Sequence, residues 1–532
     1  MKSPARLAQI LFPAIVAAAL GLGPVATAAE TSTGSGAAII LTPPPSAKPR
    51  INGAQVFGVR PGTPFLFTIA ATGDRPMTFA ADHLPAGLQL DSDTGRITGV
   101  LNKEGDYVVT LHAKNRLGEA SRPFKIVCGP HIGLTPAMGW NSWNCFASAV
   151  TAEDIKKAAD AMVSSGLINH GWTYINIDDF WEVNPHRAND PTLQGPQRDA
   201  DRNIVPNPRF PDMKALVDYV HGKGLKIGLY SSPGPWTCGG CVASFDHELL
   251  DARQYARWGF DYLKYDWCSY RPELETHRKI SEAFVSTLTN WINSFPENRR
   301  DDMRPYAIMR AALNRVPRDI LFSLCQYGMG NVWEWGAQVG GNSWRTTGDI
   351  RDTWKSMSAN GFSQISNQPF AGPGHFNDPD MLVVGYVGWG PNLHPTHLTP
   401  DEQYTHISLW CLLASPLLIG CDMTRLDPLT LSLLSNDEVL AVDQDPLGQQ
   451  AKRLVKNGDL EVWTKDMEDG SKAVGLFNRG DSPAAVEVKW SDLGWSGRHR
   501  VRDLWRQKDL GTFQNDFGAM VPRHGVELVR VW

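Results

Sequence analysis

The 532-residue sequence predicts a multidomain protein, a (β/α)8 barrel flanked by an N-terminal immunoglobulin-like β-sandwich and a C-terminal antiparallel β-sandwich. Two observations predict this organisation. Between residues 131 and 446, apolar strands alternate with amphipathic helices, the pattern of a parallel sheet. On both sides of that region the helical pattern disappears, and short alternating segments with turn signals replace it. A doubly wound open sheet competes with the barrel, but no Gly-rich phosphate loop follows the first strand.

The first 48 residues precede the predicted domains. Lys2 and Arg6 are followed by an apolar run and then by Ala26-Thr27-Ala28-Ala29, the order of a secretory signal peptide. We therefore expect residues 1–29 to be removed and the protein to be exported to the periplasm or the medium. Residues 30–48 form a predicted linker rich in Ser, Gly and Pro. No second apolar stretch approaches the roughly 20 residues that cross a bilayer, so no membrane span is expected.

Residues 49–130 carry the strand pattern of a small sandwich. Phe65-Leu-Phe-Thr-Ile, Gly99-Val-Leu and Tyr107-Val-Val-Thr-Leu-His-Ala are short apolar segments. Turn residues such as Asp93-Thr-Gly separate them. Such spacing predicts an accessory β-sandwich and indicates nothing about a ligand.

Residues 131–446 contain eight strand-like segments, as a (β/α)8 barrel requires. The segments are expected to end near Trp143, Asp179, Tyr230, Asp266, Gln326, Arg345, Asp380 and Gly420. Amphipathic helices are expected between them, over residues 151–165, 211–223, 247–258, 275–294 and 399–414. Thr151 is the expected N-cap of the first helix.

Residues 447–532 lack helical periodicity and predict the second sandwich. Strands are expected to begin near Leu460, Lys472, Ala485, Arg500 and Val526. The dipeptides Asn-Gly at 457 and Asp-Gly at 469 are hairpin turn signals. Several of these strands are apolar on both faces, which predicts packing against the barrel.

Composition excludes one class of partner. The formal net charge is −5, the pI is near 6.3, and Lys and Arg are dispersed, so no nucleic-acid footprint is present. The 19 Trp and 12 Tyr are numerous, and aromatic faces either fill a core or stack on sugar rings. Core packing accounts for most of them. Composition does not determine the oligomeric state.

Two carboxylates at predicted strand ends are candidates for catalysis. Side chains alternate along a strand, so Lys264 and Asp266 point the same way, into the barrel mouth. The positive charge favours an ionised Asp266, a candidate nucleophile. Asp349 follows Arg345 in the turn after another strand and is the candidate acid, for which we expect a less charge-compensated setting. Two such carboxylates are the minimum for cleaving a glycosidic bond. The alternative for each Asp is a helix N-cap or a hydrogen-bonding role within its loop.

Two further clusters raise the question of a metal. His375-Phe-Asn-Asp-Pro-Asp380 and Asp443-Gln-Asp445 offer imidazole and carboxylate ligands. However, no strand shows an H-x-H pattern, and we expect no metal. Loop capping and pairing with Arg are the alternative for Asp378 and Asp380.

Eight cysteines are present, an even number for an exported protein. Cys238 and Cys268 follow adjacent strand ends, where a disulfide can form, although Cys238-Gly-Gly-Cys241 also fits a metal or redox pair. Cys411 and Cys421 flank the last strand and are expected to be buried and reduced.

Five motifs resemble family 27 of the glycoside hydrolases, the α-galactosidases or melibiases. They are Leu134-Thr-Pro-Ala-Met-Gly-Trp-Asn-Ser-Trp-Asn, Tyr174-Ile-Asn-Ile-Asp-Asp-Phe-Trp, Tyr262-Leu-Lys-Tyr-Asp-Trp-Cys, Trp344-Arg-Thr-Thr-Gly-Asp and Asn377-Asp-Pro-Asp-Met-Leu. The similarity runs in order from about residue 133 to 448. In addition, the segment from Leu84 to Gly99 resembles immunoglobulin-like modules attached to bacterial glycosidases.

The resemblance implies a retaining hydrolase of α-galactoside oligosaccharides or polysaccharides with no metal or organic cofactor. It assigns Asp266 as nucleophile and Asp349 as acid/base, with their carboxyl groups about 5–5.5 Å apart. It pairs Cys238 with Cys268. Around the galactose it places Trp143, Asp178, Asp179, Tyr230, Lys264 and Arg345. Asp178 and Asp179 are implied to bind the C4 and C6 hydroxyls.

The fifth strand end departs from the family pattern. Many members have Cys-Glu-Trp there, whereas this chain has Cys325-Gln326-Tyr327. This loop reads the substituent on C2, so we expect Gln326 to contact the sugar and to favour a hydroxyl over an acetamido group. The alternatives within the family are β-L-arabinopyranosidase and α-N-acetylgalactosaminidase. A non-catalytic carbohydrate-binding protein is the alternative from another class.

Overall fold

The computed structural model describes residues 39–532, and the predicted signal peptide and most of the linker lie outside the described residues. The part that the structure describes contains no helix long and apolar enough to span a membrane.

The N-terminal domain is the predicted β-sandwich. One sheet has the order β2-β9-β8-β5 and the other β3-β7-β6, with a short β1-β4 pair. Their bounds are Arg50–Ile51 (β1), Val56–Val59 (β2), Pro64–Thr68 (β3), Ala71–Thr72 (β4), Thr78–Asp82 (β5), Leu88–Leu90 (β6), Arg96–Val100 (β7), Gly105–Asn115 (β8) and Gly118–Cys128 (β9). Apolar side chains from both sheets, including Ile97, Val109, Leu111, Phe124 and Ile126, are buried between them. Alternation along the strands therefore gives this domain its own core.

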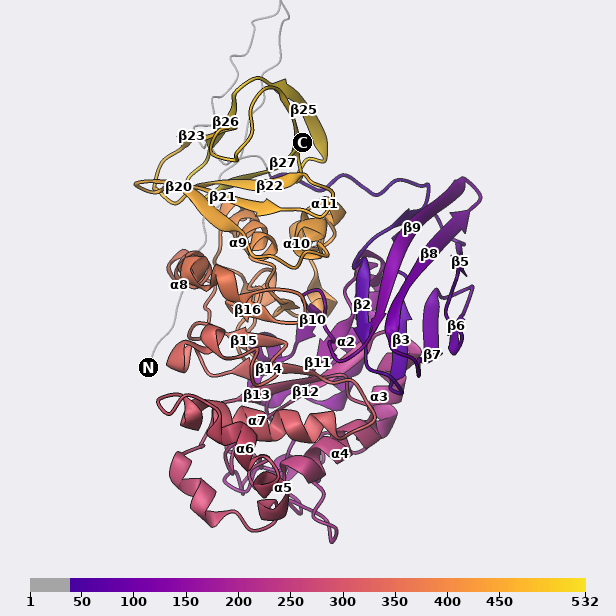
Figure 1. Cartoon of the computed structure of the whole chain (residues 1–532), viewed down its shortest axis with the longest axis vertical. Helices are drawn as coiled ribbons and strands as arrows, with labels where there is room; N and C mark the ends of the chain where they lie inside the picture. Colours follow the sequence, from indigo (N-terminus) through magenta and orange to yellow (C-terminus); the bar gives the residue numbers. More distant parts are fainter. Residues whose placement is uncertain (1–38) are drawn as a thin grey trace, which may run out of the picture. The chain divides into compact units, whose positions relative to one another are not determined.

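The central domain is a barrel of eight parallel strands (Figure 1). They are Met138–Asn141 (β10), Tyr174–Asn176 (β11), Lys226–Ser231 (β12), Tyr262–Asp266 (β13), Leu321–Cys325 (β14), Ser343–Arg345 (β15), Phe376–Asp378 (β16) and Leu417–Ile419 (β19). Each strand pairs with its neighbour in parallel. The N–H of Leu382, just past β16, donates to the carbonyl of Leu418 at 2.8 Å and closes the ring. All carboxyl ends therefore meet at one rim.

Four of the five helices that the periodicity predicts are present in the structure. The helices of the barrel domain are Trp143–Phe146 (α1), Ala152–Ser164 (α2), Met213–Gly222 (α3), Glu248–Trp258 (α4), Glu282–Ser286 (α5), Thr289–Asn293 (α6), Arg300–Asn314 (α7), Trp354–Phe362 (α8), Pro400–Leu412 (α9), Pro428–Leu434 (α10) and Asp437–Asp443 (α11). Thr151 and Asp154 form a capping box at the start of α2. A short hairpin, Tyr386–Val387 (β17) and His394–Pro395 (β18), precedes α9.

The helix expected over residues 275–294 is broken in the structure. The Asp246 carboxylate accepts hydrogen bonds from the backbone N–H groups of residues 279, 280 and 281. These N–H groups are bonded to a distant loop and not to carbonyls of a preceding helical turn. The α-helical segments of this region therefore begin only after them, as α5 and α6. Helix α7, which contains Pro305, is the longest helix that the sequence pattern did not predict, and the others are α1, α8, α10 and α11.

The C-terminal domain is the predicted antiparallel sandwich. Its six-stranded sheet has the order β20-β21-β22-β27-β24-β25, and β23 pairs with β26. The strands are Lys452–Asn457 (β20), Leu460–Asp466 (β21), Lys472–Asn478 (β22), Ala484–Lys489 (β23), His499–Asp503 (β24), Lys508–Phe513 (β25), Asp516–Val521 (β26) and Val526–Val531 (β27). Trp463, Phe477 and Trp505 belong to the barrel's hydrophobic cluster, and the Trp505 indole donates to the Ser408 hydroxyl at 2.9 Å. The second apolar face of this sheet thus packs on the barrel.

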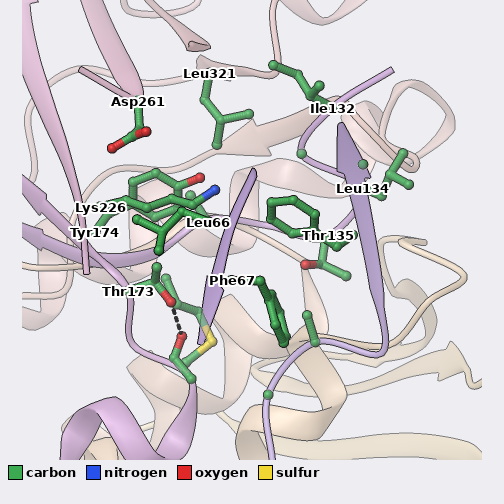
Figure 2. A pocket seen from close by; sticks show the side chains of 18 of the residues that line it. Leu66, Phe67, Ile132, Leu134, Thr135, Thr173, Tyr174, Lys226, Asp261 and Leu321 are labelled. Atoms are coloured by element: carbon green, nitrogen blue, oxygen red, sulfur yellow. Dashed lines mark hydrogen bonds between the residues drawn. The ribbon is translucent and has the colours of Figure 1, made fainter. Parts of the chain in front are cut away.

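A largely apolar pocket lies between the N-terminal sandwich and the first residues of barrel strands (Figure 2). Leu66 and Phe67 come from β3, whereas Tyr174, Lys226 and Leu321 begin β11, β12 and β14. The Arg60 guanidinium pairs with Asp319 at 2.6 Å beside this junction. The amino ends of barrel strands serve packing and stability, whereas the predicted catalytic residues follow the carboxyl ends. This pocket therefore lies at the junction of the two domains, at the opposite end of the barrel from those residues.

Candidate active site

Polar side chains from the carboxyl ends of the barrel strands line one pocket. Eight of the nine predicted catalytic and sugar-binding residues are among its lining residues: Trp143, Asp178, Asp179, Tyr230, Lys264, Asp266, Arg345 and Asp349. Cys238 also lines it. The parallel barrel therefore brings together side chains that are about 200 residues apart in sequence.

Asp266 ends β13 and is 5% exposed. The phenol of Tyr327 donates to its Oδ1 at 2.7 Å, and the phenol of Tyr230 donates to its Oδ2 at 2.9 Å. Burial raises the pKa of Asp266, while Lys264 and the two phenols oppose that rise. Each oxygen is thus oriented by a donor that stabilises the ionised form.

Lys264 does not pair directly with Asp266. Its ammonium donates to Asp178 Oδ2 at 2.8 Å, and the Asn141 amide donates to the same oxygen at 2.9 Å. Although burial lowers the pKa of Lys264, neighbouring groups led by the Asp178 charge outweigh it and raise the pKa well above its ordinary value. Lys264 therefore remains a cation that anchors Asp178 and acts on Asp266 through space.

Asp179 is held by backbone donors. The N–H of Gly239 donates to Oδ2 at 2.7 Å and that of Phe180 to Oδ1 at 2.8 Å. A Cβ on Gly239 would lie 2.5 Å from the Phe180 ring and 2.9 Å from Asp179 Oδ2, so only glycine allows this approach. Burial raises the pKa of Asp179 to about 6.

The predicted disulfide between Cys238 and Cys268 is present, with Cα atoms 5.0 Å apart. It joins the loop after β12, which carries Gly239, to the loop after β13. The other six cysteines, including Cys241, Cys411 and Cys421, are buried and free. This arrangement resolves the ambiguity about Cys238 in favour of a bridge.

Asp349 lies in a more charged setting than we expected for an acid. Its side chain is 57% exposed and Oδ1 lies 3.1 Å from an Arg345 guanidinium nitrogen. Partial burial raises the pKa of Asp349, but Arg345 and Lys264 outweigh it and hold the pKa below its ordinary value. In the free protein Asp349 is therefore ionised at neutral pH. The same guanidinium lies 3.0 Å from Asp380 Oδ2, so Arg345 is shared between two carboxylates.

The fifth strand end differs from the sequence-based expectation. Gln326 does not line the pocket, because its amide accepts from Gly328 N–H at 2.9 Å and donates to the Met329 carbonyl at 3.2 Å. Tyr327 lines the pocket instead, with a positive φ of 63°. Gln326 shapes the turn, and Tyr327 faces the pocket. Alternation along β14 could not reveal this turn geometry.

Other lining residues were not predicted. They are Asn144, Tyr327, Ile350, Asp380, Met381 and Trp389. The sequence did suggest that Asp380 pairs with an Arg, as it does here with Arg345. Trp389 lies in a Gly-Trp-Gly segment, a pattern that could have indicated an accessible aromatic side chain. Trp389 has φ 50° and its N–H donates to the Asn144 carbonyl, which turns the ring toward the pocket.

The sequence matches three protein families in the order of the three domains. It matches the alpha galactosidase A family over residues 135–295 and 286–445. It matches the alpha galactosidase C-terminal beta sandwich domain over residues 457–531 and an Ig domain family over residues 48–129.

Individual proteins and solved structures are similar to most of this chain. An alpha-galactosidase of Coffea arabica is 42% identical over 399 residues, which are 74% of this chain and 92% of that protein. A solved structure from Bacteroides fragilis has a TM-score of 0.80 and 36% identity, covering 93% of this chain and 98% of that one. A GH27 β-L-arabinopyranosidase of Geobacillus stearothermophilus is more distant, at 27% identity and a TM-score of 0.62, covering 75% and 96%.

Removing the Tyr327 hydroxyl tests the polar environment of Asp266. Tyr327→Phe deletes a donor that lowers the pKa of Asp266. We expect the acidic limb of the kcat/KM profile to move to higher pH and kcat/KM at its optimum to fall about tenfold, or about 1.4 kcal/mol. Tyr219→Phe is the control, because that hydroxyl bonds a surface carboxylate, Asp160. An unchanged acidic limb in Tyr327→Phe would show that the ionisation of Asp266 does not set that limb.

Glu182 gives a prediction for pH-dependent stability. It is fully buried, and neither carboxylate oxygen has a hydrogen-bond partner among the described residues. Burial, reinforced by Asp179, raises the pKa of Glu182 well above its ordinary value. Above pH ~4.3 the unfolded chain loses this proton while the folded chain keeps it, so the free energy of unfolding falls with rising pH by up to about 1.4 kcal/mol per unit.

We therefore expect the free energy of unfolding of Glu182→Gln to fall less with rising pH than that of the wild type. Thermal midpoints of the variant and the wild type are compared at pH 5 and pH 8. The variant should gain stability relative to the wild type between the two pH values. An equal difference at both values would show that Glu182 is ionised in the folded protein.

Proposed function

Since the chain belongs to the alpha galactosidase A family, family 27 of the glycoside hydrolases, and is an α-galactosidase, we propose that it hydrolyses terminal α-galactosides with retention of configuration. Asp266 is the nucleophile and Asp349 the acid/base. The observation that supports these roles is the contrast between the two carboxylates in one pocket. Asp266 is buried and held by two phenols, whereas Asp349 is exposed to water.

The first step forms an ester between the enzyme and the sugar. An Asp266 oxygen attacks C1 from the β face, the bond from C1 to the glycosidic oxygen breaks, and that oxygen takes the proton of Asp349. Asp349 must first gain this proton. A bound sugar displaces water from it, which raises its pKa, and the nearby Asp266 charge favours the protonated form.

In the second step Asp349 acts as the base and Asp266 is the leaving group. Asp349, now ionised, takes a proton from water while the water oxygen attacks C1. The bond from C1 to Asp266 breaks and the Asp266 carboxylate is restored. Esterification has removed the Asp266 charge by then, and Arg345 favours the ionised Asp349 that the base role needs. Two inversions at C1 give net retention.

The remaining lining residues suit a galactose ring. We assign Asp178 and Asp179 to the C4 and C6 hydroxyls, with Trp143 on an apolar face of the sugar. A pentopyranose without the C6 hydroxyl would lose one hydroxyl contact to a buried carboxylate, which disfavours β-L-arabinopyranosides. Tyr327, rather than Gln326, lines the pocket at the fifth strand end, and we propose that its ring crowds an acetamido group on C2.

We also propose that the protein works outside the cytoplasm. The basic and apolar leader with its Ala-x-Ala ending supports export. The disulfide between Cys238 and Cys268 supports an oxidising destination, because such bridges are rare where thiols are kept reduced. Its position in the wall of the site makes this compartment relevant to activity.

The stereochemical course tests the mechanism. Proton NMR of p-nitrophenyl α-galactoside hydrolysis should show α-galactose as the first product, and a fluorinated galactosyl inactivator should label the peptide containing Asp266. Asp266→Asn should abolish turnover and labelling, whereas Asp516→Asn, at an exposed position, should change neither. A β-anomer as first product would exclude retention, and label on another peptide would exclude Asp266 as the nucleophile.

Leaving-group dependence tests the acid role of Asp349. In Asp349→Ala the leaving oxygen receives no proton, so substrates with poor leaving groups should lose the most activity. We expect a loss of at least about 100-fold on raffinose-type oligosaccharides. Formation of the galactosyl ester from p-nitrophenyl α-galactoside should be much less affected, measured as a pre-steady-state burst. Equal losses of this first step for both leaving groups would contradict the acid role.

A further inference from the structure

Asp352, His394 and His397 form a cluster outside the lining of the active-site pocket. One ligand atom from each residue lies within 4.8 Å of the others. Asp352 follows the loop of Asp349, and the two histidines lie in and just after β18. The cluster therefore joins two segments that are about 40 residues apart in sequence.

The carboxylate is fixed, and the imidazoles are accessible. The Asp352 side chain is 7% exposed, and its Oδ2 accepts from the His397 backbone N–H at 2.9 Å. The side chains of His394 and His397 are 37% and 64% exposed. A cation can thus approach from solvent toward a preplaced oxygen, which is the usual requirement for an entry path.

The distances fit a site that closes by small side-chain movements. His397 Nδ1 lies 2.8 Å and His394 Nδ1 lies 3.8 Å from Asp352 Oδ2, and the two rings are 4.4 Å apart. Ligands about 2.0–2.2 Å from a tetrahedral ion lie roughly 3.3–3.6 Å from one another. His394 Nδ1 also lies 3.0 Å from the Pro395 carbonyl, so a rotation of this ring exchanges that contact for the ion.

The chemistry of the cluster selects its ligand. Two neutral imidazoles and one carboxylate suit Zn²⁺ and neighbouring divalent transition metals, whereas Mg²⁺ and Ca²⁺ prefer oxygen ligands. The nearby cation, Arg351, places its guanidinium over the Trp389 ring at 4.8 Å. Three protein ligands leave a fourth position for water.

We propose that Asp352, His394 and His397 bind one divalent transition-metal cation, such as Zn²⁺, at the rim of the active site. The ion ties the loop of Asp349 to the β17–β18 hairpin. That hairpin carries Trp389, which lines the sugar pocket. The ion takes no part in bond cleavage, and its binding does not depend on the proposed role of Asp349.

Calorimetric titration of chelator-treated protein with ZnCl₂ tests the site. Wild type should bind one Zn²⁺ per chain with micromolar or tighter affinity, and His394→Ala/His397→Ala should bind at least tenfold more weakly. His112→Ala is the matched control, because His112 lies between Asp82 and Glu119 on the N-terminal domain. Equal affinity in the double variant, or no binding by wild type at 100 µM Zn²⁺, would overturn the proposal.

Hydrogen exchange tests the tether separately. Zn²⁺ should slow amide exchange over residues 350–353 and 386–397 in wild type and in His112→Ala, and should leave the double variant unchanged. His397→Gln, at the more exposed ligand, provides a second variant should the double variant fail to fold. Zn²⁺ binding without slower exchange in these segments would overturn the tether. Chelator-treated wild type and the double variant should hydrolyse p-nitrophenyl α-galactoside equally well, which separates this site from the catalytic residues.

Discussion

The ion pair between Lys264 and Asp178 at 2.8 Å is the interaction on which the site depends. Both groups are largely removed from water, and the Asp178 charge opposes the effect of burial on the pKa of Lys264. The pair spans β13 and the loop after β11 and fixes the spacing of two nonadjacent strands of the ring. It also leaves a positive charge two residues before Asp266, which opposes the effect of burial on that carboxylate.

The barrel mouth contains more acid than base. Five buried carboxyl groups, Asp178, Asp179, Asp266, Asp378 and Asp380, face two cations, Lys264 and Arg345. Burial raises the pKa values of Asp179 and Asp378 to about 6, which relieves part of the repulsion. The excess of negative charge suits a reaction whose transition state resembles an oxocarbenium ion, because positive charge develops on the sugar where these groups converge.

Strand periodicity in the sequence predicted the ends of the barrel strands that carry the site. Asp266 and Arg345 are the last residues of β13 and β15, as predicted, because alternation and burial specify where a parallel strand ends. Periodicity could not place Gln326 and Tyr327. Their directions depend on a left-handed φ at Tyr327 and on hydrogen bonds within the loop. Similarly, helix periodicity gave no indication that the distant Asp246 would bind residues 279–281 and interrupt a helix.

The roles proposed for the two carboxylates follow from where each lies in its βα unit. Asp266 is the last residue of its strand, so it is buried by its neighbours and restrained by Tyr230 and Tyr327. A nucleophile needs such restraint, because its attack requires one geometry. Asp349 lies four residues beyond its strand, in a loop, where solvent reaches it and Arg345 is the cation in direct contact with it. A group that must donate a proton and then accept one from water needs that access. The two proposed roles therefore each suit one of these positions, even though the side chains are chemically identical.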